Sequence, residues 1–168
     1  MPGLRRLRRA CCSGCLGLLA FAASSVASSE QIVLDHSIGP VSVLETRADV
    51  ERGLGHGLPG KPNLRQHTLI VRYPKAALTV GYSSRTTMDR THEQVVYVLT
   101  TAPRYKTASG VGVGSSGRAV GSVHGMSCYG TPPYACQHGM APGKTGTAFA
   151  FRDGKVWRVV VGVSGIFG

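Results

Sequence analysis

Acidic residues are scarce in this chain. Its 168 residues include 8 Asp and Glu against 19 Lys and Arg, which gives a formal net charge of +11. Catalysis by paired carboxylates needs acids that come together. Most of the acids here flank one predicted helix, so such a centre is not indicated. The basic residues between Arg47 and Arg158 are scattered singly, which argues against a surface dedicated to nucleic acid or phospholipid.

The sequence also lacks complete motifs for nucleotide binding and nucleophilic catalysis. Gly112–Gly117 reads G-x-G-x-x-G, but no apolar strand precedes it and no acid follows at the spacing of a ribose partner, so it predicts a tight turn into a short helix. Gly139–Thr145 resembles a phosphate loop, yet it has three residues instead of four between its glycines, and one is Pro142. No G-x-S-x-G elbow is present.

The histidines form no metal-binding pattern such as H-x₃-H or H-E-x-x-H. We expect them to lie in surface loops. No catalytic, cofactor-binding or metal-ligating residue is therefore predicted, no cofactor is implied, and the protein is predicted not to be an enzyme. The six histidines are His36, His56, His67, His92, His124 and His138.

Long hydrophobic runs are missing as well. The most apolar stretch, Ala10–Ala23, has 14 residues, against about 20 for a membrane-spanning helix. Four arginines between Arg5 and Arg9 precede it, and the small-residue sequence Ser25–Ala27 follows, an order typical of a secretory signal peptide. We predict cleavage after Ala27, no transmembrane span afterwards, and a secreted protein, extracellular or periplasmic. Loss of the four arginines lowers the net charge from +11 to +7.

Few cysteines remain after such a cleavage. Cys11, Cys12 and Cys15 leave with the signal, and none follows the apolar run as a lipoprotein cysteine would. Two cysteines in an oxidising compartment are expected to pair, so we predict a Cys128–Cys136 disulfide. Two free thiols are the alternative.

What the chain does contain is a repeated segment. Residues 41–50 read VSVLETRADV and residues 111–120 read VGVGSSGRAV, at an offset of 70 residues. Self-similarity at a fixed spacing indicates one supersecondary unit used twice. We predict a lead-in over 28–37, a first unit over 38–107 and a second over 108–168. The matched pairs are Val41 and Val111, Val43 and Val113, Thr46 and Ser116, Val50 and Val120, and Gly55 and Gly125.

Each unit is predicted to begin with a short helix. Thr46 opens a T-x-x-D start signal, so a helix is expected over about 47–54, and the second helix is expected over 117–123. Val50 and Val120 are predicted to be buried on the inner faces of these helices, whereas Arg47 and Arg118 are expected to face solvent.

Strands are predicted to follow each helix. Period-2 alternation favours strands over 68–73 and 77–82, and a strand over 94–101 that is apolar on both faces is expected to be central. Strands over 147–152 and 156–163 form a predicted hairpin across Asp153-Gly154. The fold class is therefore α+β, with two tandem units, each a short helix packed on an antiparallel β-meander.

A family resemblance rests on the two repeated segments. Ile38–Val41 before Val50, and Gly110–Ser116 before Val120, resemble a pattern of short strand, small-residue turn and helix with an inward valine. It is similar to the β-lactamase-inhibitory-protein fold and to the outer-membrane assembly lipoprotein BamE. The resemblance implies that fold from Ile38 to Val163. No lipidation cysteine is present, and no contact residues are carried over.

These features together predict an exported, non-enzymatic binding or structural module. Its partner would be an unknown protein or a cell-envelope component, and not nucleic acid. A joined sheet surface would form the contact, with Tyr97, Trp157 and Arg158 among the contacting residues. One alternative is a small secreted hydrolase, which needs a pocket with converging histidine and acid side chains. Another is an envelope-associated protein held by its positive charge.

Overall fold

Strands dominate the molecule, and the fold is α+β with two antiparallel-rich sheets and two short helices. The computed structural model describes residues 30–64, 67–83 and 93–165. The predicted signal peptide, residues 1–27, and His92 lie outside these ranges. The larger sheet has the order β4-β5-β6-β7-β12-β11-β10-β9. Its strands are β4 (Leu58–Pro59), β5 (Thr68–Tyr73), β6 (Leu78–Ser83), β7 (Val95–Thr100), β9 (Ser127–Tyr129), β10 (Ala135–His138), β11 (Thr145–Arg152) and β12 (Lys155–Val163).

Two meanders meet at the centre of this large sheet. Every neighbouring pair of its strands is antiparallel, and β7 pairs with β12 so that Val98 lies opposite Val161. The strand expected to be central is thus β7, as its apolar residues on both faces indicated. The β11–β12 hairpin turns at Asp153 and Gly154, whose φ values of 51° and 71° fit the predicted tight turn.

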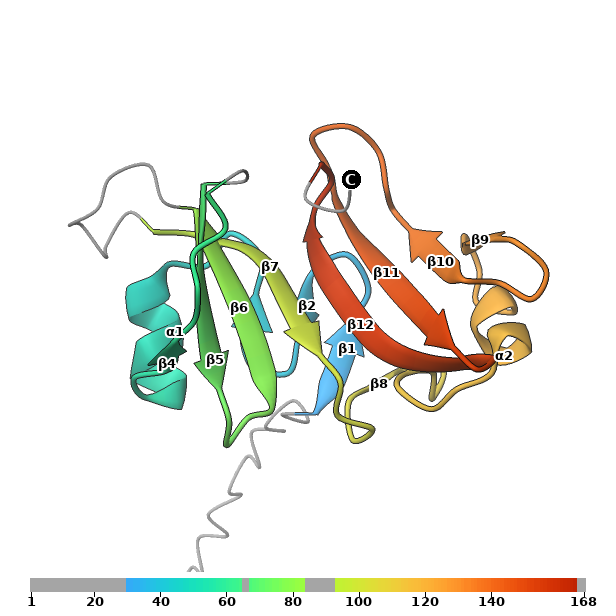
Figure 1. The fold of residues 1–168 in the computed structure, drawn as a ribbon, viewed down its shortest axis with the longest axis horizontal. Helices are drawn as coiled ribbons and strands as arrows, with labels where there is room; N and C mark the ends of the chain where they lie inside the picture. The colour runs from blue at the N-terminus through green and yellow to red at the C-terminus, as the bar shows by residue number, and fades with distance from the viewer. Residues whose placement is uncertain (1–29, 65–66, 84–92, 166–168) are drawn as a thin grey trace, which may run out of the picture.

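A smaller sheet with the order β3-β2-β1-β8 lies behind β7 and β12 in Figure 1. Its β1 pairs in parallel with β8, and Ile32 and Ile38 on its strands are buried in the core. We did not predict these strands because segments of two or three residues are too short to show a period. They are β1 (Gln31–Val33), β2 (Ser37–Ile38), β3 (Val41–Ser42) and β8 (Lys106–Thr107).

The two helices lie at opposite ends of the large sheet (Figure 1). α1 (Arg47–Leu54) has the predicted bounds, because Thr46 caps its start and Gly55, with φ 75°, ends it. α2 (Gly117–Gly121) is two residues shorter than predicted and begins after its N-cap Ser116. Both predicted inner-face valines are buried: Val50 is 2% exposed and Val120 is fully enclosed.

Arg47 does not face solvent, contrary to prediction. Its side chain is 12% exposed and bonds Glu51 at 2.7 Å and Glu93 at 2.8 Å. The reason is that the first turn of α1 lies against the segment entering β7, where the Arg47 amide donates to the Glu93 carbonyl. Burial alone would lower the pKa of Arg47, but hydrogen bonds to Glu93 and Glu51 raise it. Arg118 is exposed, as predicted.

The backbone that leads into each helix has the same local geometry. Leu44 and Gly114, 70 residues apart, both have positive φ, 71° and 89°. The backbone amide of each donates a hydrogen bond of 2.8 Å to the carbonyl of a buried strand valine. This valine is Val95 for Leu44 and Val156 for Gly114. The valine amide in turn donates to the next residue of the lead-in, Glu45 at 2.8 Å or Ser115 at 2.9 Å.

One continuous hydrophobic core fills the space between the large sheet and the elements that cover it. Alternate residues of the central strands, such as Val80, Val98 and Val161, enter this core. Val50 from α1 and Ile38 from the small sheet meet them there. The opposite face of the large sheet, which we call the open face, is formed by the residues between these core positions.

Candidate functional site

The open face presents side chains from both meanders. One cross-strand row runs through Thr79, Leu99, Val160 and Ala148, which are paired in register on β6, β7, β12 and β11. Because alternate residues of a strand point to opposite faces, the rows on either side of Val98 and Val161 belong to this surface. It further carries Ile70, Arg72, Tyr97, Arg152, Trp157 and Arg158.

Each central strand has an irregularity that adds a side chain to the open face. On β12 the register shifts opposite Ala150 and Phe151, so Val156 and Val159 both enter the core while Trp157 and Arg158 both lie outside it. A similar shift next to Gly81 places Val96 and Tyr97 of β7 outside the core. β-Bulges of this kind re-aim side chains and often lie near functional sites.

Trp157 is stacked between two arginines. The guanidinium carbon of Arg152 lies 4.7 Å from the Trp157 ring centroid, and that of Arg158 lies 4.6 Å away. Both distances are typical of cation–π contacts. Among the described residues, neither guanidinium forms an ion pair with a carboxylate, and the buried Nε of Arg158 has no hydrogen-bond partner. The stack therefore holds an aromatic ring and two positive charges in one place.

Tyr97 also lies on the open face, and its ring lies across the neighbouring strand β6. A Cβ at Gly81 would collide with the Tyr97 ring, and one at Gly162 would lie 2.7 Å from the Tyr97 Cβ. Gly81 therefore lets the ring rest against β6, and Gly162 lets β12 approach the backbone of β7 closely. Burial raises the pKa of Tyr97, and the nearby charge of Arg158 lowers it in part, so the phenol stays neutral.

Charge is distributed unevenly between the two faces. None of the described strands of the large sheet contains Asp or Glu. The described acids lie outside these strands: Glu51 and Glu93 surround Arg47 at α1, and Glu30 faces Arg104 at 3.5 Å. Asp153 lies in the β11–β12 turn, next to Arg152 in the chain. The open face is thus basic and partly aromatic.

The predicted disulfide between Cys128 and Cys136 is formed. It joins β9 to β10, where the two cysteines lie opposite each other in register. A disulfide sulfur is not a thiolate, so Cys128 is not available as a nucleophile to a histidine. The bond is compatible with the predicted secretion.

His138 differs from the surface-loop histidine that we expected. It lies in β10 with a side chain 26% exposed, and its Nδ1 is 2.7 Å from Oδ2 of Asp35. The hydroxyl of Thr147 donates to the other Asp35 oxygen at 3.0 Å. Sequence reasoning missed this cluster because 103 residues separate Asp35 from His138.

One further predicted feature is the turn that precedes the second helix. Gly112–Gly117 is the turn into α2, with Gly114 at φ 89°. Within the described part of the chain, no group of three or more His, Cys, Asp or Glu side chains could hold a metal ion. No helix there is long and apolar enough to cross a membrane.

Comparisons with known proteins identified no relative of this chain. No protein-family model, no curated protein and no solved structure matches this chain. The side chains of the open face therefore carry the functional assignment.

Proposed function

We propose that this protein is an exported, non-enzymatic binding module that holds a partner protein on the open face of its large sheet. The observation that carries the proposal is the Arg152–Trp157–Arg158 stack, which shares the open face with Tyr97. Trp, Tyr and Arg are the residues most enriched among energetic hot spots of protein interfaces. Here the bulge in β12 places Trp157 and Arg158 on this face, and Gly81 makes room for the Tyr97 ring.

The partner surface should carry carboxylates. Arg72, Arg152 and Arg158 all lie on the open face, where the described strands offer no acid to neutralise them. Complementary charge speeds encounter and fixes orientation across an interface. An acidic protein surface with an apolar centre fits this face better than a basic or purely apolar one.

We further propose that the two halves are tandem copies of one unit. The strand order of the large sheet supports this, because the last strand of each half, β7 or β12, lies at the centre and the earlier strands follow outward. The matched lead-ins to α1 and α2, 70 residues apart, support it too. A resemblance to the β-lactamase-inhibitory-protein and BamE-like folds is part of this proposal.

The alternative, a small secreted hydrolase, has one observation in its favour. Asp35 and His138 form a carboxylate–histidine pair like the one that orients a catalytic base. The nearest hydroxyl, that of Thr147, donates to Asp35 and not to His138. Hydrolysis of p-nitrophenyl acetate that disappears in His138→Ala would favour this alternative over the binding module.

The binding proposal can be tested by capture from culture medium and envelope extract. Three baits are compared: the wild-type chain, Trp157→Ala and a control, Leu64→Ala. Leu64 is 79% exposed in the segment before β5, a strand that β6 and β7 separate from β12 in the sheet. We expect one protein that wild type and the control retain and Trp157→Ala loses. Equal retention by all three correctly folded baits would exclude the open face as the binding surface.

A further inference from the structure

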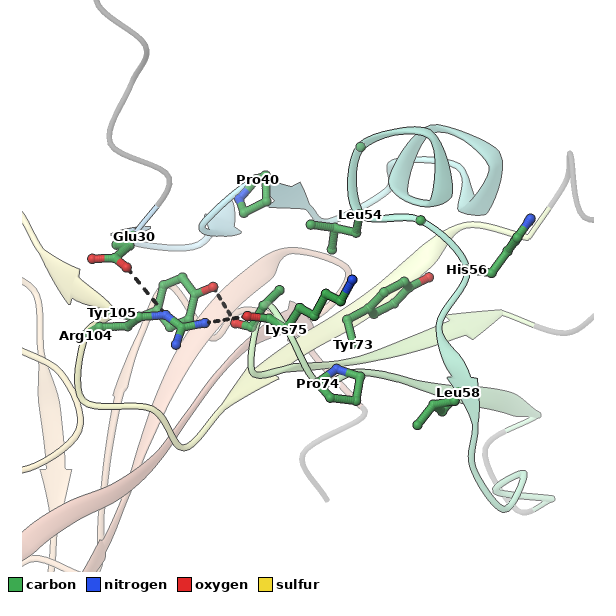
Figure 2. Close-up of a pocket in the computed structure, with 13 residues that line it drawn as sticks. Glu30, Pro40, Leu54, His56, Leu58, Tyr73, Pro74, Lys75, Arg104 and Tyr105 are labelled. Atoms are coloured by element: carbon green, nitrogen blue, oxygen red, sulfur yellow. Dashed lines mark hydrogen bonds and ion pairs between the residues drawn. The ribbon is translucent and has the colours of Figure 1, made fainter.

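A cavity of about 780 Å³ lies away from the open face, next to the end of α1. Figure 2 shows it between the α1–β4 linker, the β5–β6 turn and the residues that precede β8. Its volume falls within the range of small-molecule sites. Its apolar wall consists of Pro40, Leu54, Leu58, Tyr73, Pro74 and Ala76.

The cavity is held in shape by hydrogen bonds between distant segments. The Tyr105 hydroxyl donates to the Ala76 carbonyl at 2.6 Å, and Arg104 donates to the Lys75 carbonyl at 3.2 Å. These bonds fix the β5–β6 turn from the side of β8. On the opposite side, the Gly55 amide ends α1 by donating a hydrogen bond to the backbone carbonyl of Glu51 at 2.9 Å. A ligand would therefore meet a largely preformed wall.

Lys75 differs from the other charged residues that line the cavity, because each of those has a partner among the described residues. Arg104 is paired with Glu30 at 3.5 Å, and His56 is paired with Glu51 at 2.8 Å. Lys75 forms no ion pair or side-chain hydrogen bond with the described residues. Figure 2 shows its side chain pointing toward Tyr73, one of the residues of the apolar wall.

We propose that this cavity binds an amphiphilic monoanion, a medium-chain carboxylate in chemical class. The carboxylate would pair with Lys75, and the hydrocarbon chain would cover Leu54, Leu58 and Tyr73. A charged head and an apolar body match the two kinds of surface that the cavity offers. This site is independent of the proposed partner surface on the large sheet.

Isothermal titration calorimetry with sodium decanoate tests the proposal on the full chain. Decyltrimethylammonium has the same tail with the opposite charge, and acetate has the head without the tail. We expect decanoate to bind about tenfold more tightly than either. Absence of decanoate binding, or equal binding of decyltrimethylammonium, would overturn the proposal.

Three variants locate the site. Lys75→Met keeps the apolar stem and removes the charge, and it should weaken decanoate binding about tenfold. Gly53 lines the cavity, and a Cβ there meets open space, so Gly53→Phe should fill the cavity without unfolding α1 and abolish binding. Lys155→Met, at an exposed position of β12, should bind as wild type does. Wild-type affinity in both Lys75→Met and Gly53→Phe would place the ligand elsewhere and refute the proposal.

Discussion

Among single residues, Glu51 forms ion pairs with two basic side chains. Its two carboxylate oxygens accept hydrogen bonds from Arg47 at 2.7 Å and from His56 at 2.8 Å. Arg47 also donates a hydrogen bond to Glu93. Burial raises the pKa of Glu51, but the hydrogen bonds from Arg47 and His56 outweigh it, and the net direction is downward. A carboxyl group with a lowered pKa stabilises the fold above its unfolded pKa and loses that effect in acid.

We therefore expect Glu51→Gln to be less stable than wild type at pH 7. The difference should shrink as pH falls below about 4.3, the ordinary pKa of glutamate, and vanish once Glu51 is protonated in the folded state. Melting temperatures of both proteins between pH 7 and pH 3 measure this. Glu30→Gln is the control, since an exposed ion pair contributes little. A constant difference across the pH range would contradict the assignment.

A second prediction at this scale concerns the buried valines Val50 and Val120. Changing either to Asp places a carboxylate in the core without a partner, which should cost at least about 3 kcal/mol of unfolding free energy. Arg118→Ala, at an exposed site, should cost less than about 0.5 kcal/mol. Denaturant midpoints of these variants and of the wild type measure the losses, and equal losses in the valine and arginine variants would contradict the prediction. Arg47 is not a suitable control because its ion pairs are partly buried.

At the scale of elements, length decided what could be predicted. α1 and the strands β5, β6, β7, β11 and β12 have enough residues to show capping signals or a period of two, and each was predicted within about three residues. The strands of two to four residues were missed because they are too short to show a period, and some of them, such as β1 with β8, pair with distant segments. Their hydrogen bonds are tertiary, so local sequence does not specify them.

The disulfide between β9 and β10 is predicted to stabilise the fold. A loop closed over a separation of eight residues should contribute roughly 2–3 kcal/mol in the chain-entropy model. Cys128→Ser/Cys136→Ser should lower the denaturant midpoint accordingly and leave far-UV circular dichroism nearly unchanged. Unreduced protein should resist alkylation at both cysteines. Free alkylation without a reductant would show that the bond does not form in solution.

For the whole molecule, the two halves share one core and one sheet. β7 joins β12 at the centre of the large sheet, and β1, from the start of the described chain, pairs with β8. Buried residues from both halves belong to a single cluster. Because neither half encloses its own core, we expect the molecule to unfold as one cooperative unit.

Fluorescence can test this cooperativity. Trp157 is the only tryptophan and reports on the second half. Leu58→Trp, at a position 53% exposed on β4, combined with Trp157→Phe reports on the first half. Both probes should give one midpoint that coincides with far-UV circular dichroism. Two separate transitions would mean that the halves fold independently.

The candidate site was predictable only in part. Tyr97, Trp157 and Arg158 were named from sequence as contacts on a joined sheet surface, and they lie together on the open face. The second arginine of the stack, Arg152, was not named, because its contact with Trp157 depends on the bulge in β12. A bulge reflects cross-strand register, which no local pattern in the sequence encodes.

The edges of the large sheet carry a consequence for how the protein can associate. The two outermost strands, β4 and β9, have only two and three residues; β4 ends in a proline, and β9 is covalently tied to its neighbour. Short, proline-containing edges offer few free amide and carbonyl groups to a foreign strand. Strand addition, whether by a ligand peptide or in an aggregating chain of copies, is therefore disfavoured at either side. We therefore expect a partner of the large sheet to contact its side chains and not to extend it by a further strand.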